Sequence, residues 1–468
     1  MISLRPYQDQ CIAGLRGAFA AGYHSPLLVS PTGSGKTVMF SYLTGKLLGA
    51  GKRVALLCHR EELVDQISRT LTEFDVRHGL ITSGALYDRR LMAHVASVAT
   101  LIRRLERVAV PDYVIMDEAH HGILASTWGK IIAFWRGKNP ALRLIGVTAT
   151  PERLSGEGLG EVFDEMVLGP TTRELMDLGS LCDYRLFAAH HTAYLSAIGK
   201  QAGEFKKGES ADVMMKPEIV GDTVEEYRRL LNGAPTISFE VSIKNAEAMA
   251  ERFRGAGYRS MCLDGKMDKT LRRDVVRDFS RGQINVLTSC DIVSEGFDVP
   301  GIVGGILRRP TWSLALYLQQ AGRTFRTAPG KGEAILVDQV GNSARHGLPC
   351  DPRTWSLTGR EERRGKKSDE ENVACRQCEK CYAVSPAAAS KCRECGAPFP
   401  VKARKIEEVA GQLSEVEVAK MRRQSAREQA AARTLEDLIQ IGIERGMRNP
   451  HGWASHVHAA RLAKEARG

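Results

Sequence analysis

Short apolar runs alternate with amphipathic segments along the chain up to about residue 345. Four apolar runs in the first half are long enough for strands but too short for helices, at 26–30, 53–59, 113–120 and 142–150. Between the second and third runs, residues 61–74 place apolar side chains at helical spacing. Strands that are apolar throughout and separated by helices predict a parallel sheet covered on both faces, and hence an α/β fold.

The same alternation returns in the second half and predicts a second α/β domain. A candidate helix at 269–282 separates two of the candidate strands. The stretch from about 171 to 230, between the two domains, is irregular and polar, and we expect it to hold the connection and a mobile loop. The candidate strands of the second domain lie at 235–242, 258–265, 284–290, 301–307 and 332–339.

The character of the chain changes after residue 350. A mixed charge run at 358–372 indicates an exposed linker. The tail from residue 401 is rich in Ala, Glu, Arg and Leu, which favours helices. We therefore divide the chain into a first α/β domain at 1–170, a connection at 171–230, a second α/β domain at 231–350, a charged linker at 351–372, a cysteine-rich module at 373–400 and a helical C-terminal region at 401–468.

The length and charge of the chain narrow the choice of partners. Its 468 residues correspond to about two to four domains. The net charge of +11 fits a polyanion such as nucleic acid, with a solvated basic surface as the alternative. The sequence has no apolar run of the ~18 residues that a membrane span needs, and its N-terminus lacks a signal-peptide core. We therefore expect a cytoplasmic protein with reduced thiols and no membrane partner.

Five of the eleven cysteines lie close together in the sequence. Two Cys-x-x-Cys pairs, Cys375/Cys378 and Cys392/Cys395, are separated by 13 residues. Each pair can present two thiolates from one tight turn, and two pairs complete a tetrahedral site, so we predict structural zinc in a small ribbon. Cys381 is the alternative to Cys378 as a ligand. With so little apolar sequence, the module would fold largely through its metal.

The stretch "SPTGSGKT" (30–37) follows an apolar strand and precedes a helical run. Such a turn lets backbone N–H groups converge on phosphate oxygens at a helix N-terminus. Lys36 would reach the β- and γ-phosphates of a nucleotide, and Thr37 would hold Mg²⁺. The full phosphate-loop pattern has glycine where this chain has Ser30. The remaining loop residues that we expect around the phosphates are Thr32, Gly33, Ser34 and Gly35.

The stretch "VIMDEAHH" (114–121) ends an apolar strand in two carboxylates. Asp117 would hold the magnesium ion, and Glu118 would position and deprotonate an attacking water. A solvated turn is the alternative for this pair. His120 could relay between this site and "TATP" (148–151), or could be an ordinary hydrogen-bonded histidine.

These motifs carry a family resemblance. "DEAH" after "PTGSGKT" resembles the superfamily 2 helicases and translocases, and the match extends from residue 1 to about 345. The branch that looks most similar is that of compact XPB-like or phage-type DNA helicases. Further stretches that resemble family motifs in the expected order are "LRPYQ" (4–8), "CHREEL" (58–63), "SVATL" (97–101), "TATP" (148–151), "TSCDIVSEGFDVP" (288–300) and "QQAGRTFR" (319–326).

The resemblance implies two tandem RecA-like domains with ATP bound between them. It implies that the second domain supplies Gln319, Arg323 and Arg326 across the cleft, with Arg326 as the main arginine finger. A planar, permanently charged guanidinium suits the transferred phosphoryl group. The nucleotide contacts that the resemblance further implies are Arg5 and Gln8, with Gln8 at the base, and Gly296 and Asp298 near the ribose and phosphates.

The resemblance also places four residues near the nucleic-acid backbone: His59, Arg60, Thr100 and Thr288. Contacts to phosphates position a strand without reading its sequence, so we expect salt-sensitive binding without sequence preference. The stretch "RRPTWS" (308–313) adds basic residues, and its tryptophan could stack on a base or, as we favour, be a buried interdomain aromatic.

We therefore expect an ATP-dependent nucleic-acid helicase or translocase that uses ATP, magnesium and zinc. DNA is favoured over RNA as its partner, in replication, recombination or repair. The alternatives are an RNA-remodelling helicase and an ATP-gated clamp that binds a strand without unwinding it. The zinc ribbon or the helical tail could hold a protein partner.

Overall fold

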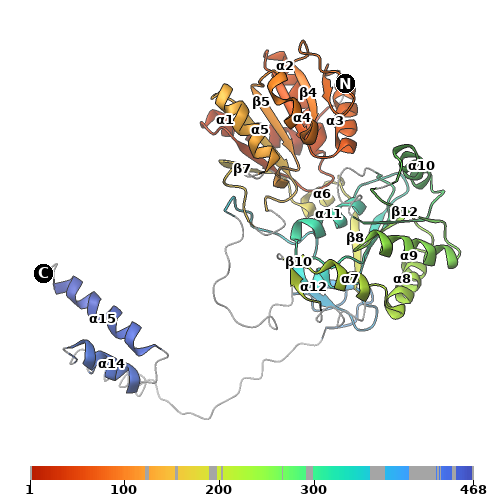
Figure 1. Ribbon diagram of the computed structural model, residues 1–468. Coiled ribbons are helices and arrows are strands. Elements are labelled where there is room, and N and C mark those ends of the chain that lie inside the picture. The colour runs from red at the N-terminus through yellow and green to blue at the C-terminus, as the bar shows by residue number, and fades with distance from the viewer. Residues whose placement is uncertain are drawn as a thin grey trace. The chain divides into compact units, whose positions relative to one another are not determined.

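The computed structural model describes residues 3–121, 126–152, 157–188, 198–201, 204–265, 267–290, 299–358, 375–399, 428, 432, 434–444 and 449–465. The chain divides into two compact units, Met1–Pro400 and Val401–Gly468. The first unit contains two parallel-sheet α/β domains and the cysteine module, and the second contains a pair of helices (Figure 1). No helix among these described residues is both long and apolar enough to cross a lipid bilayer.

The first α/β domain is built on a seven-stranded sheet in which neighbouring strands pair in parallel. The strand order is β3-β4-β2-β5-β6-β1-β7. The four predicted strands are confirmed, whereas β3, β4 and β7 were not predicted. The strands are β1 (Pro26–Val29), β2 (Val54–Cys58), β3 (Gly79–Ile81), β4 (Ala93–Ser97), β5 (Tyr113–Asp117), β6 (Arg143–Thr148) and β7 (Glu165–Leu168).

Helices cover both faces of this sheet, as the continuous apolar strands predicted. Successive strand residues point to opposite faces, so Leu27 belongs to one buried cluster and Leu28 to another. Trp135 of α5 packs in the first cluster, and Ile67 of α3 packs in the second. The helical segments are α1 (Pro6–Ala20), α2 (Lys36–Gly49), α3 (Glu61–Glu73), α4 (Val98–Arg104), η1 (Leu105–Arg107), η2 (Ala119–His121) and α5 (Thr127–Lys138).

The second α/β domain has a six-stranded parallel sheet in the order β12-β13-β11-β14-β15-β8. Its edge strand β8 comes from residues 171–230, which we had predicted to hold the connection and a mobile loop. As an edge strand with a partly exposed face, β8 lacks the continuous apolar run of the central strands. The strands are β8 (Asp183–Ala188), β11 (Thr236–Phe239), β12 (Ser260–Leu263), β13 (Val286–Ser289), β14 (Gly304–Leu307) and β15 (Glu333–Asp338).

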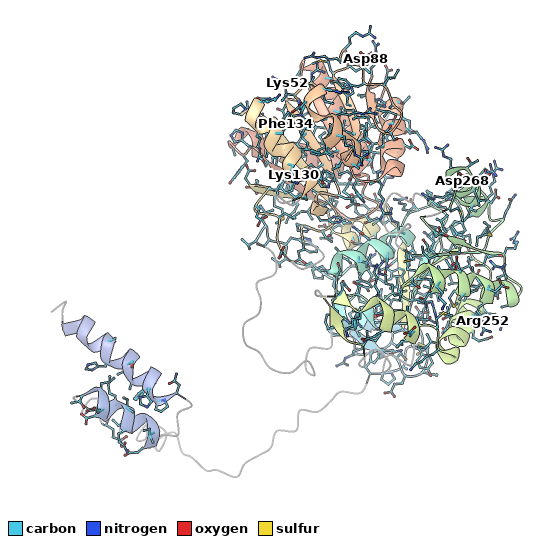
Figure 2. All side chains as sticks on the ribbon, viewed as in Figure 1. Lys52, Asp88, Lys130, Phe134, Arg252 and Asp268 are labelled. Atoms are coloured by element: carbon cyan, nitrogen blue, oxygen red, sulfur yellow. The ribbon has the colours of Figure 1, made fainter. Side chains whose placement is uncertain are left out.

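Helices of the second domain include one with a clear local start signal. Asp268, labelled in Figure 2, caps α10, because its carboxylate accepts hydrogen bonds from the amides of Thr270 and Leu271 at 2.8 and 3.3 Å. The helices are α6 (Thr172–Asp177), α7 (Lys207–Val213), α8 (Pro217–Leu230), α9 (Ile243–Gly255), α10 (Lys269–Ser280), α11 (Leu314–Thr324) and α12 (Asn342–His346). A short hairpin, β9 (Lys200–Gln201) and β10 (Glu204–Phe205), precedes α7.

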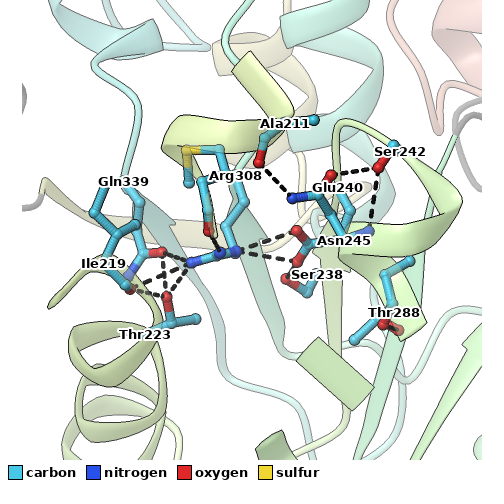
Figure 3. A network of polar contacts seen from close by, with 12 residues as sticks. Ala211, Ile219, Thr223, Ser238, Glu240, Ser242, Asn245, Thr288, Arg308 and Gln339 are labelled. Carbon is cyan, nitrogen blue, oxygen red and sulfur yellow. Dashed lines mark hydrogen bonds and ion pairs between the residues drawn. The ribbon is translucent and has the colours of Figure 1, made fainter. Parts of the chain in front are cut away.

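A fully buried arginine joins helices of the second domain to the carboxyl end of its sheet (Figure 3). Arg308 follows β14, and its Nε donates to the carboxylate of Glu240, which follows β11, at 3.1 Å. Its Nη1 donates to Gln339 Oε1 at 2.9 Å and to the Thr223 hydroxyl of α8, and its Nη2 donates to the carbonyl of Met214, after α7, at 2.6 Å. These partners compensate the buried charge, and they hold α7 and α8 against the sheet.

Residues 351–358 return to the first domain instead of extending as a solvated linker. The carbonyl of Leu357 accepts a hydrogen bond from the amide of Gly160 at 2.8 Å. Trp355 packs against the buried clusters of both α/β domains. The prediction of an exposed linker was therefore wrong for this part, because it rested on the charges that follow and overlooked the aromatic residue. The remainder of the predicted linker, 359–372, lies outside the described residues.

The cysteine module docks on the free edge of the second sheet. Its strands, β16 (Cys375–Gln377) and β17 (Val384–Pro386), form an antiparallel hairpin. The amide of Ala188 donates to the carbonyl of Tyr382 at 3.1 Å, and Gln377 Nε2 donates to the carbonyl of Ala188 at 2.6 Å. The module is therefore attached to β8. In the second unit, the described residues form α14 (Leu435–Glu444) and α15 (Pro450–Glu465), consistent with the predicted helical tail.

Candidate nucleotide site, zinc group and nucleic-acid interface

The predicted nucleotide residues of the first domain meet at one edge of its sheet. Strands β5, β6 and β1 are neighbours and run parallel, so the segments after their carboxyl ends lie side by side. The loop 30–35 follows β1. Asp117 is the last residue of β5 and Glu118 follows it, and Thr148 is the last residue of β6. This edge of a parallel α/β sheet is where ligands of such folds bind.

The loop after β1 wraps around the ammonium group of Lys36, the first residue of α2. Lys36 Nζ donates to the carbonyls of Ser30 and Pro31, both at 3.2 Å. Gly33 and Gly35 have φ values of +86° and +79°, which other residues rarely adopt. This backbone turns the loop onto the N-terminus of α2 and suits the close approach of phosphate oxygens.

Side chains at the start of α1 hold this loop through hydrogen bonds. The Tyr7 hydroxyl and Gln8 Nε2 both donate to the carbonyl of Ser34, at 3.0 and 3.1 Å. Gln8 Oε1 accepts from the amide of Arg5 at 2.9 Å. A Cβ atom at Gly35 would lie 2.5 Å from Gln8 Nε2, so this glycine permits the contact. We had predicted a base contact for Gln8, and the structure adds a bracing contact that Tyr7 shares and that local sequence did not signal.

The two carboxylates are buried at the end of β5. The amide of Glu118 donates to Asp117 Oδ1 at 3.1 Å, and Glu118 has a φ of +50°, a strained value of the kind found at functional sites. His120 Nδ1 lies 3.5 Å from Glu118 Oε2 and 3.3 Å from Thr148 Oγ1. The Thr148 hydroxyl in turn donates to the carbonyl of Thr150 at 2.8 Å. His120 therefore lies between the carboxylates and the "TATP" segment, a position that fits both a relay and an ordinary hydrogen-bonded histidine.

The arginine motif of the second domain lies against the loop of the first. A Cβ atom at Gly322 of α11 would be 2.7 Å from Thr32 Cβ, and one at Gly33 would be 3.7 Å from Arg326 Cγ. Arg323 is buried near the end of α11 and Arg326 is half-buried beyond it. The structure therefore brings together residues of the two motifs that are nearly 300 positions apart in the sequence. Gln319, also buried, lies on the same helix.

The electrostatics of this group favour an anion. Burial lowers the pKa of Lys36, Glu118 and Asp117 raise it, and Arg323 and Arg326 lower it again. Burial lowers the pKa of Arg326 to about 10, so its guanidinium keeps its charge near neutral pH. Three basic side chains, those of Lys36, Arg323 and Arg326, thus lie near the two carboxylates in a largely buried site. A polyphosphate would add the negative charge that offsets the excess.

A second constellation is a group of four cysteines in the docked module: Cys378, Cys381, Cys392 and Cys395. Their sulfur atoms all lie within 4.8 Å of one another, and the Cys378–Cys395 and Cys381–Cys392 pairs are each 3.5 Å apart. Four thiolates around a zinc ion at ~2.3 Å would be about 3.8 Å apart, so the group fits a tetrahedral zinc site.

The predicted ligand set was wrong at its first member. Cys375 lies outside the group, and its sulfur is 3.4 Å from the carbonyl of Ser343 as part of the contact with the second domain. Cys381, which we had considered only as a substitute for Cys378, instead takes the place of Cys375, and Cys378 remains in the group. Three cysteines at equal intervals offer two Cys-x-x-Cys pairs, and only the β16–β17 hairpin, whose turn carries Cys378 and Cys381, decides between them.

Comparisons with known proteins identify the family. Residues 1–153 match the family described as "Type III restriction enzyme, res subunit", and residues 217–328 match "Helicase conserved C-terminal domain". A 51.5 kDa protein of a Lactococcus phage (isolate 7-9) is 34% identical over 362 residues, which cover 77% of this chain and 75% of the phage protein. The chain belongs to the superfamily 2 helicases.

Further similarities agree with this placement. A Saccharomyces cerevisiae protein named as an ATP-dependent helicase, IRC3, is 27% identical over 358 residues, which cover 73% of this chain but only 52% of the yeast protein. A fragment of an HsdR-type subunit of a type I restriction enzyme from Vibrio vulnificus has a similar fold, with a TM-score of 0.57 and 20% identity over 74% of this chain and 67% of the fragment. The two α/β domains of this helicase are therefore RecA-like, and the protein is a helicase-type ATPase.

Three of the predicted nucleic-acid contacts of the helicase lie together at the carboxyl edge of the first sheet. His59 and Arg60 follow β2, and Thr100 lies on α4, directly after the neighbouring strand β4. All three are half-buried. Arg60 Nε lies 3.2 Å from His59 Nε2. A ligand at this edge could meet all three side chains.

Several other predictions need correction or fall outside the described residues. Thr288 is fully buried in β13 and donates to the carbonyl of Ala246 at 2.6 Å, so it is not a surface contact (Figure 3). Trp312, for which we had favoured a buried interdomain position, stacks on Phe205 within the second domain, with ring centroids 5.6 Å apart. Nor does Arg308 add to a basic surface, because it is the buried arginine described above. Gly296 and Asp298 lie outside the described residues.

Proposed function

We propose that this helicase hydrolyses ATP between its two RecA-like domains and uses the cycle of closure and opening to move along DNA. The observation that carries this proposal is the packing of α11, which contains Arg323, and of Arg326, which follows it, against the phosphate loop that precedes Lys36. A site divided between two domains is complete only when they meet, so turnover and domain movement are coupled.

The proposed roles follow from the positions of the residues. Lys36 and the loop 32–35 hold the phosphates, while Thr37 and Asp117 hold Mg²⁺, which neutralises charge on the phosphates when bound. Glu118, buried beside Asp117, orients the attacking water and accepts its proton. Arg326 stabilises the charge of the transferred phosphoryl group, with Arg323 beside it and Gln319 on the same helix. Arg5 and Gln8 border the loop on the side where the nucleotide binds.

DNA is the polyanion that we favour, in replication, recombination or repair. The first domain matches a restriction-enzyme family, and a structurally similar restriction-modification enzyme, LlaBIII, is described as bound to DNA. The phage relative supports a place in the compact, phage-type branch of helicases. The net charge of +11 and the edge residues His59, Arg60 and Thr100 support contacts to phosphates, which are sensitive to salt.

The test measures ATP turnover by the full chain alone and with single- and double-stranded DNA and RNA. We expect stimulation by DNA that weakens as salt is raised, and strand displacement on forked, tailed or Holliday-type substrates. Stimulation by RNA alone would replace the proposal with RNA remodelling. Stimulated turnover that displaces no strand indicates a translocase, and strand binding with no turnover would instead identify an ATP-gated clamp.

We further propose that the four-cysteine group holds one structural zinc ion. Cys378, Cys381, Cys392 and Cys395 supply four thiolates, which leaves no open position for catalysis. Because the module contacts β8, the metal would fix the shape of a surface on the edge of the second RecA-like domain, available to a nucleic acid or protein partner.

Replacing Cys381 with serine should remove zinc, whereas replacing Cys375 with serine should not. The reason is that Cys381 lies in the sulfur group, while Cys375 contacts Ser343 and serine can keep that hydrogen bond. Elemental analysis of the purified proteins should find about one zinc per chain in the parent and in Cys375→Ser, and much less in Cys381→Ser. The opposite pattern would restore the ligand set that includes Cys375.

A further inference from the structure

The hairpin β9–β10 lies at the N-terminal end of the arginine helix α11. Phe205 of the hairpin is buried and stacks on Trp312, which precedes α11. Arg345 lies over both rings, at 4.9 Å from the centroid of Phe205 and 5.3 Å from that of Trp312. The hairpin is therefore anchored to the turn from which α11 begins.

One carboxylate of this hairpin holds that turn. Glu204 Oε1 accepts hydrogen bonds from the Thr311 hydroxyl at 2.7 Å and from the Ser313 amide at 2.8 Å. Glu204 Oε2 accepts from the Trp312 amide at 3.1 Å. Hydrogen bonds to an ionised acceptor are stronger than neutral ones, and an anion at a helix N-terminus is also favoured by the helix dipole.

The held helix ends at the proposed arginine finger. Ser313 is the N-cap of α11, and its side chain accepts from the Leu316 amide at 3.3 Å. The 11 residues of α11 are nearly all buried, and Arg323 lies in its last turn. A buried helix of this length spans about 16 Å and moves as a rigid body, so a shift at its start displaces the arginines at its end.

We propose that Glu204 is a positioning residue for ATP hydrolysis, which acts through α11 on the placement of Arg323 and Arg326 against the phosphate loop. This inference rests on the proposed ATPase function. It assigns a role to the β9–β10 hairpin, which lies in the segment 171–230. The hairpin determines how close the guanidinium groups of the two arginines come to the phosphoryl group.

The experiment compares Glu204→Ala and Glu204→Gln with the parent, using ATP and a single-stranded DNA oligonucleotide. A displacement of about 1 Å at a reacting centre can cost about 100-fold, so we expect kcat of Glu204→Ala to fall by roughly 10- to 100-fold. The KM for ATP should stay within about twofold, because ground-state binding through Lys36 is untouched. Glu204→Gln keeps one acceptor oxygen but loses the bond to the Trp312 amide, so its kcat should fall less.

A double-mutant cycle separates positioning from general damage. In a background that lacks both arginines (Arg323→Ala with Arg326→Ala), under single-turnover conditions, Glu204→Ala should change the rate by less than about twofold, since its effect passes through these arginines. Additive losses would overturn the inference. If Glu204→Ala does not fold, as judged by thermal melting, the same cycle with Glu204→Gln decides.

A matched control is Glu251→Gln, which removes a carboxylate of the same domain that pairs with Arg254 on the surface of α9. Its kcat should equal that of the parent. An active parent with unaffected Glu204 variants would overturn this inference and leave the proposed function intact. A parent without DNA-stimulated turnover would overturn both.

Discussion

Replacing Arg326 with alanine should slow ATP hydrolysis by about 10³-fold or more while nucleotide still binds. Arg326 lies beside the phosphate loop but belongs to the other RecA-like domain, and no other group in the described site carries its delocalised, bidentate charge except Arg323. The variant loses a group that stabilises the charge developing in the transition state. The kcat should therefore fall, while the dissociation constant for ATP should change little. Single-turnover hydrolysis and binding of a fluorescent nucleotide measure the two quantities.

Two further variants show how a loss of hydrolysis in Arg326→Ala should be interpreted. Arg323→Ala should have the smaller effect if Arg326 is the main finger, and the reverse order would exchange their roles. Arg254→Ala is the matched control, because this arginine forms an exposed pair with Glu251 and should leave hydrolysis unchanged. A near-normal rate in both Arg323→Ala and Arg326→Ala would mean that the two arginines only stabilise the end of α11.

Replacing Lys36 with alanine should abolish measurable ATP turnover. The ammonium group lies at the centre of the loop, between the carbonyls of Ser30 and Pro31, and faces both carboxylates. Without it the phosphates lose a buried positive partner, and the buried pair of Asp117 and Glu118 then repels them. Steady-state turnover with saturating DNA measures the effect, and nucleotide binding should weaken as well.

The control for this variant lies on the same helix. Lys46→Ala removes an exposed lysine from the last turn of α2, where its ammonium group lies over the Tyr42 ring at 5.3 Å. It should leave turnover unchanged. Retained turnover in Lys36→Ala would refute the assignment of the loop after β1 as the phosphate site.

Local features of the site were predictable because short stretches of chain create them. A glycine-rich turn between a strand and a helix has few conformations, and the φ values of Gly33 and Gly35 agree with that expectation. Two acidic residues where an apolar strand ends are expected at the carboxyl ends of the strands of a sheet, and Asp117 and Glu118 lie there. Each of these inferences needed only the identity of near neighbours in sequence.

Residues whose surroundings come from distant segments were harder to predict. Arg308 looked like a surface cation, but its charge is offset by Glu240, Thr223 and Gln339, which are 31 to 85 residues away in the sequence. Thr288 was predicted from its place in a motif, although the carbonyl that binds its hydroxyl belongs to Ala246. In both cases burial by remote elements changed the role of a polar side chain.

The α/β class, the order of the two parallel-sheet domains and the phosphate-loop and carboxylate motifs could be predicted from the amino-acid sequence, since these depend on periodicity and on residues close in the chain. The family resemblance had already implied that Arg323 and Arg326 face the loop, whereas the tertiary structure was needed to show which four of five clustered cysteines converge and that Glu204 holds the start of α11. The physical reason is that hydrogen bonds, ion pairs and metal ligation act over a few ångströms. Such groups work together only where the packing of distant segments places them within reach.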